Sequence, residues 1–75
     1  MSNLQNKRIA AGMSQSQLAK ASGVPVGVLQ HYEQGSRNID GAKLETLADL
    51  AAALGCKIPE LLESPELVEK VRRYS

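Results

Sequence analysis

A chain of 75 residues is long enough for one small domain, and its apolar residues (43%) include only two aromatic side chains, Tyr32 and Tyr74, which favours closely packed short helices. A single Cys and a single His exclude an internal disulfide and a typical zinc site. The sequence has no apolar run of about 20 residues and no signal-peptide core. We therefore expect a cytoplasmic protein without metal, cofactor or membrane segment. The net charge of +1 is unevenly spread, because residues 1–43 carry five basic and two acidic side chains whereas residues 44–75 carry four basic and six acidic ones.

The first two predicted helices are bracketed by start and stop signals. One spans about residues 4–11, with Ser2 or Asn3 before it and a glycine after it. The second begins after Ser14, which is a good N-cap because Gln17 follows three residues later and completes a capping box. It ends near Ser22, since a glycine comes next.

A third helix is predicted to start at Pro25, because proline at the first helical position loses no hydrogen bond. Gly35 closes this helix about ten residues later. Leu29 and Tyr32 are expected on its inner face.

A fourth helix is predicted after Asp40 as the N-cap, with Ile39 and Leu44 placed to form a hydrophobic staple around it. A helically spaced apolar stripe follows, comprising Leu44, Leu47, Ala48, Ala51 and Leu54. Such a stripe could line a groove for a partner, but stripes with this spacing are more typical of a core, and we expect a core here.

The remaining segment is predicted to form a short fifth helix from Pro59 and a further helix from Pro65 to about Arg73, which Ser64 would cap. Cys56 is interpreted as a small buried apolar residue rather than a reactive thiolate. We predict a domain over residues 1–63, followed by a C-terminal helix or tail over residues 64–75.

Residues 14–35 meet the packing requirements of two short helices joined by a tight turn. Ala19 permits a close crossing, and Gly23 suits the turn. Four apolar side chains can lock the second helix onto the first: Leu18, Val24, Leu29 and Tyr32.

This arrangement resembles the helix-turn-helix of the Cro/C1-type family of bacterial and phage regulators, also called the XRE family. The resemblance covers about residues 4–63, in the segments KRIAAGMSQSQLAKASGVPVGVLQHYEQG and LADLAAALGCKIPELL. It implies an all-α, lambda-repressor-like bundle of five short helices that binds duplex DNA. It also implies that Gln15 approaches a DNA phosphate at the start of its helix and that Arg8 and Glu33 form an ion pair.

The third helix would enter the major groove, and the loop after it would contact the DNA backbone. The candidate DNA contacts are Gln15, Gln17, Pro25, Val26, Gly27, Gln30, His31, Arg37, Asn38 and Lys43. Some of these residues also have plainer interpretations, since His31 could be a surface residue and a charged loop could simply be solvated. Val26 and Gly27 cannot read hydrogen-bond patterns on bases, so specificity is expected to depend on Gln30, His31, Gln15 and DNA shape.

The sequence therefore predicts a DNA-binding transcriptional regulator that acts as a homodimer. The alternative is an antitoxin-like protein-interaction module on the same fold, with secondary DNA binding. Its contacts would come from the C-terminal helix through Leu67, Val68, Val71 and Tyr74. An enzyme is not expected, because no acid–base pair, phosphate loop or nucleophile arrangement is present.

Overall fold

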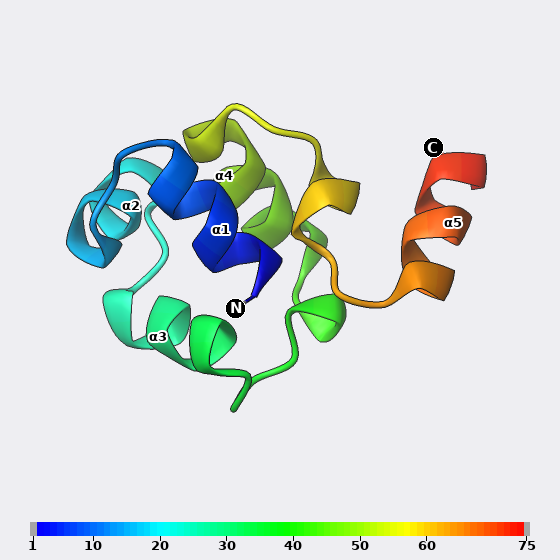
Figure 1. The fold of residues 1–75 in the computed structure, drawn as a ribbon, viewed down its shortest axis with the longest axis horizontal. Helices are drawn as coiled ribbons and strands as arrows, with labels where there is room; N and C mark the ends of the chain where they lie inside the picture. The colour runs from blue at the N-terminus through cyan, green and yellow to red at the C-terminus, as the bar shows by residue number, and fades with distance from the viewer. Residues whose placement is uncertain (1, 75) are drawn as a thin grey trace.

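The computed structural model describes residues 2–74 and contains, in that range, five α-helices, two short 3-10 helices and no strand (Figure 1). In chain order the elements are α1 (Asn3–Ala10), α2 (Gln15–Ser22), α3 (Val26–Gln34), η1 (Ile39–Gly41), α4 (Leu44–Leu54), η2 (Ile58–Leu61) and α5 (Pro65–Tyr74). The predicted all-α fold is confirmed, and the C-terminal helix is present as α5. Residues 1 and 75, at the outer limits of the predicted domain boundaries, lie outside the described residues.

Leucine is the most frequent residue in the buried core of residues 2–74, which also contains Val24, Tyr32, Ile39 and Ala51. Five leucines, contributed by α1, α2, α3, α4 and η2, have no solvent exposure: Leu4, Leu18, Leu29, Leu50 and Leu61. Each stabilises the fold by about 2 kcal/mol relative to an exposed position. Because every element from α1 to η2 except η1 places a leucine in this core, α2 and α3 are held in a fixed mutual orientation.

The fourth helix begins later than the sequence predicted. Asp40 lies in η1, which Asn38 caps by accepting a hydrogen bond from the Asp40 amide at 3.0 Å. Lys43 is the N-cap of α4. The predicted staple is also wrong, because Leu44 is 72% exposed whereas Ile39 is buried. The chain makes a tight turn at Asn38 and reaches α4 four residues beyond Asp40.

The apolar stripe of α4 is divided between the core and the surface. Leu47, Leu50 and Ala51 are buried, as a core helix requires. Leu44 and Ala48 are exposed, so the prediction that the whole stripe is core is wrong for these two residues. One flank of α4 thus presents apolar side chains to solvent.

Helix α5 lies at the end of the molecule opposite α2 and α3 (Figure 1). The linker before it is held at both sides. The Asp40 carboxylate accepts hydrogen bonds from the amides of Glu63 (2.8 Å) and Ser64 (3.0 Å), and the Asn3 side chain donates to the carbonyl of Leu62 at 2.8 Å. Ser64 then caps α5 through its hydroxyl, which accepts from the Leu67 amide.

Candidate nucleic-acid interface

The turn between α2 and α3 is fixed by local hydrogen bonds. The Ser14 hydroxyl accepts from the Gln17 amide at 3.0 Å, and the Gln17 side chain accepts from the Ser14 amide at 2.8 Å, which completes the predicted capping box. Gly23 ends α2 with a φ of 77°, a conformation that glycine adopts without strain. The chain therefore leaves α2 and enters α3 in a defined direction.

The outer face of α3 carries the residues predicted to enter a major groove. Leu29 and Tyr32 are buried on the inner side, whereas the opposite side is exposed and comprises Val26, Gly27, Gln30, His31 and Gln34. Pro25 is the N-cap residue rather than the first helical residue, which corrects the predicted start by one position. The first exposed side chain of this face is Val26.

A charged cluster at the inner side of α3 ties it to α1 and α2. Arg8 Nε donates to Glu33 Oε2 at 2.8 Å and Arg8 Nη2 donates to Glu33 Oε1 at 3.0 Å, a bidentate pair whose side chains are only 12% and 2% exposed. This hydrogen bonding raises the pKa of Arg8 above its usual value. Arg8 Nη1 also donates to the carbonyl of Met13 at 2.8 Å, ahead of α2.

Gln15 belongs to the same cluster. Its Nε2 donates to Glu33 Oε1 at 3.2 Å, a contact that the sequence did not predict. An amide group has two N–H donors, so one remains for another acceptor at the start of α2. The capping role of Gln17 likewise uses its side-chain oxygen and leaves its amide donors.

The loop after α3 lies beside the outer face of that helix. Arg37 donates its backbone N–H to the carbonyl of His31 at 3.1 Å. Arg37 lines a hollow together with Pro25, Gly27 and His31. The structure thus brings the loop cation next to the first turn and the middle of α3.

Asn38 and Lys43 share a second hollow with Arg37. Together these three exposed residues line this hollow of about 650 Å³ between the start of α3 and the start of α4. Glu45 and Asp49 of α4 border the same hollow, so its charge is mixed. Arg37 and Lys43 supply its two cations.

The His31 ring is oriented by a residue that sequence reasoning missed. His31 Nδ1 lies 2.8 Å from Ser36 Oγ, and that hydroxyl also donates to the carbonyl of His31 at 3.3 Å. Ser36 stands beyond the end of α3, where no helical spacing rule links it to His31. The hydrogen bond leaves Nε2 as the ring nitrogen that can meet a ligand.

Comparison with known proteins adds one finding. A family model described as helix-turn-helix matches residues 4–61. No curated protein and no solved structure shows significant similarity to the chain. Within residues 2–74, no helix combines the length and apolar character needed to cross a membrane, and no group of three or more His, Cys, Asp or Glu side chains could hold a metal ion.

Proposed function

Because the chain belongs to the Cro/C1-type helix-turn-helix family of DNA-binding regulators, we propose that it is a transcriptional regulator that inserts α3 into the major groove of duplex DNA. The observation that carries the proposal is the proximity of Arg37 to the exposed face of α3. A helix in the groove is flanked by phosphates, so a cation beside its first turn can reach the backbone while the helix faces the bases.

Phosphate contacts fix the position of the protein in this proposal. Arg37 and Lys43 supply charge, and Asn38 supplies amide donors, since only its side-chain oxygen is used to cap η1. At the start of α2, Gln15 and Gln17 add their remaining amide donors next to the positive end of the helix. These contacts bind DNA without distinguishing its sequence.

Base reading depends on a small set of side chains. Gln30 can accept from and donate to an adenine, and His31 can present Nε2 to a base edge. Val26 suits a thymine methyl group, and Gly27 lets the backbone approach the bases closely. With so few hydrogen-bonding groups at the start of α3, DNA shape supplies a large share of the specificity.

A homodimer completes the proposed function. One chain exposes a single short reading helix, which is a small interface for tight specific binding. Two copies would contact half-sites about 34 Å apart, one turn of the duplex. The second candidate, a protein-interaction module, has one specific observation in its favour, the exposed apolar surface of α4 and α5.

Fluorescence anisotropy with a random-sequence duplex at low salt tests the proposed DNA contacts. Arg37→Ala and Lys43→Ala should each weaken binding, whereas Lys7→Ala, which removes the same charge from the side where Glu60 and Glu63 lie, should not. Gln30→Ala should leave random-duplex binding nearly unchanged, because base contacts contribute little there. Binding that is lost equally in Lys7→Ala and Arg37→Ala would show that the proposed face is not the DNA interface.

A further inference from the structure

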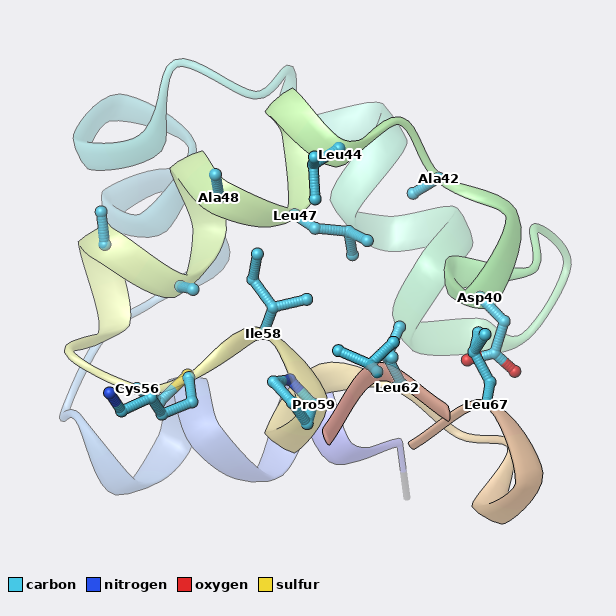
Figure 2. A pocket seen from close by; sticks show the side chains of 14 residues that line it. Asp40, Ala42, Leu44, Leu47, Ala48, Cys56, Ile58, Pro59, Leu62 and Leu67 are labelled. Atoms are coloured by element: carbon cyan, nitrogen blue, oxygen red, sulfur yellow. The ribbon is translucent and has the colours of Figure 1, made fainter. Parts of the chain in front are cut away.

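Two hollows on the described surface differ in the chemistry that they offer to a ligand. The groove between α4, η2 and α5 is lined mostly by apolar side chains, with Asp40 and Lys57 as the charged exceptions (Figure 2). The hollow at the start of α3 combines an imidazole, a hydroxyl and a guanidinium group. Its lining residues are Pro25, Gly27, Val28, His31, Ser36 and Arg37. This second hollow is therefore the one suited to recognition by directional hydrogen bonds.

The Ser36 hydroxyl makes two contacts that together fix the position of the proton on the His31 ring. Ser36 Oγ lies 2.8 Å from His31 Nδ1 and 3.3 Å from the carbonyl oxygen of His31. A carbonyl can only accept, so the single proton of the hydroxyl is directed to it. Oγ then has only lone pairs to offer the ring. Both contacts are hydrogen bonds when Nδ1 carries a proton and donates it to Oγ.

The opposite tautomer satisfies fewer groups. With the ring proton on Nε2, the hydroxyl of Ser36 would have to turn toward Nδ1, and its hydrogen bond to the carbonyl of His31 would be lost. Because the hydrogen bond at one ring nitrogen selects the tautomer, the contact with Ser36 favours the Nδ1–H form.

The backbone holds Ser36 beside the ring without help from its side chain. Arg37 donates its backbone N–H to the same His31 carbonyl at 3.1 Å, and the two lone pairs of that oxygen can accept from Arg37 and Ser36 together. Gly35 ends α3 with a φ of 81°, which turns the chain back toward His31. Removing the hydroxyl should therefore leave the path of the loop intact.

A neutral imidazole with its proton on Nδ1 presents Nε2 as an acceptor only. On the major-groove edge, adenine and cytosine carry an exocyclic amine where guanine and thymine carry a keto oxygen. An acceptor nitrogen forms a hydrogen bond with the amine, but it faces the keto oxygen lone pair to lone pair. A ring with its proton on Nε2 would have the reverse preference.

We propose that Ser36 is a positioning residue that sets the base preference of His31, so that His31 reads adenine or cytosine rather than guanine or thymine at one position of the site. The inference rests on the proposed function, because it requires α3 in the major groove, and it deepens that function by naming the class of base. Ser36 acts through the ring and need not touch DNA. Gln30 differs in this respect, since its amide group both donates and accepts and fits either class of base.

Nitrogen-15 NMR of the free protein reads the tautomer directly. The chain has one His, so the imidazole signals need no assignment. At alkaline pH, where the ring is neutral, the wild type should show a protonated Nδ1 and an unprotonated Nε2. Ser36→Ala should move the signals toward the Nε2–H form, whereas Ser36→Thr, which keeps the hydroxyl, should retain the wild-type pattern. Ser36 is exposed, and circular dichroism should show unchanged helix content in both variants.

Selection of bound duplexes from a random library tests the base preference. The wild type should enrich adenine or cytosine at the position whose preference disappears in His31→Ala. Exchanging adenine for guanine, or cytosine for thymine, at that position should weaken wild-type binding by roughly two- to tenfold, as the loss of one hydrogen bond predicts. In Ser36→Ala this penalty should largely disappear, and in Ser36→Thr it should remain.

Two comparisons separate this effect from a general loss of structure. The same duplexes are used for every variant, so a difference in DNA shape between them affects all variants alike. Ser36→Ala should also keep the preferences that depend on Gln30 and the wild-type affinity for random duplex, because neither depends on the tautomer of His31.

Four results would overturn the inference: a free wild-type ring protonated at Nε2, no position whose preference depends on His31, enrichment of guanine or thymine at that position, or a Ser36→Ala variant that keeps the full wild-type preference. Any of these results together with binding to random duplex rejects the inference and leaves the proposed function standing. Absence of binding to random duplex at low salt rejects the proposed function, and the base preference falls with it.

Discussion

Arg8→Ala removes the cation from an ion pair that is almost closed to solvent. Glu33, at 2% exposure, would lose both hydrogen bonds from the guanidinium and keep only the one from Gln15. Leaving one member of a buried pair without its partner typically costs about 3–5 kcal/mol. A chain of 75 residues has a total stability of roughly 4–11 kcal/mol, so this one change removes a large part of it. The melting temperature should fall by at least about 12 °C.

Thermal and urea unfolding followed by circular dichroism measures the loss. Lys7→Ala is the matched control, because Lys7 neighbours Arg8 on α1 and its pair with Glu60 is 39% and 37% exposed. Surface pairs of this kind contribute little to stability, because solvent screens the two charges. A loss below about 1 kcal/mol for Arg8→Ala, or one equal to that of Lys7→Ala, would refute the reasoning.

Replacing both partners separates the cost of an orphaned charge from the worth of the pair. In the double variant Arg8→Met with Glu33→Leu no charge is left unpaired, so its destabilisation should be much smaller than the sum of the two single alanine variants. A double variant as unstable as that sum would mean that the two side chains act independently.

Three further predictions concern other parts of the fold. Gly27→Ala should stabilise the protein by up to about 1 kcal/mol, because Gly27 is helical and a methyl group there meets no atom within 4 Å. Urea unfolding measures this, and an unchanged or lower urea midpoint would contradict it. Asp40→Ala should cost about 1–2 kcal/mol and speed hydrogen exchange at the Glu63 and Ser64 amides, which exchange as in the wild type if Asp40 does not hold them. The hydrogen bond from the Lys57 amide and then that from the Lys7 side chain lower the pKa of Glu60 below its usual value. The stability that Glu60 contributes is therefore complete above its unfolded pKa and is lost as the pH falls through the lower folded value. Glu60→Gln should show a smaller acid-induced loss of stability over that pH range than the wild type, and an identical loss would count against this prediction.

Elements whose ends are set by local chemistry were predictable from the sequence. The capping box at Ser14 and the glycine turn at Gly23 follow from a few neighbouring residues, and both occur in the structure as predicted. The inner face of α3 was also predictable, because Leu29 and Tyr32 recur with helical spacing.

Features that depend on tertiary context were not predictable in the same way. Asp40 has the residue type of an N-cap, but its carboxylate accepts from amides more than 20 residues further along the chain. Leu44 and Ala48 have core spacing, yet α4 buries only the flank that faces the other helices. Periodicity identifies an apolar flank, whereas the placement of α5 decides whether anything covers it.

Within the candidate DNA interface, the exposed helix face was predictable from the sequence, whereas the hydrogen-bonded partners were not. The exposure of Val26, Gln30 and His31 agrees with the predicted helix face. The contact of Gln15 with Glu33 depends on how α2 packs against α3, and that of His31 with Ser36 depends on the path of the loop after α3. No spacing in the sequence predicts either contact.

The salt dependence of duplex binding tests DNA recognition by this face most directly. The logarithm of the association constant should fall linearly with the logarithm of salt concentration, and Arg37→Ala should reduce that slope by about 0.9, as expected when one phosphate contact is lost. The Lys7→Ala control should keep the wild-type slope. Absence of binding to any duplex at low salt, or an Arg37→Ala slope equal to that of the wild type, would contradict the account.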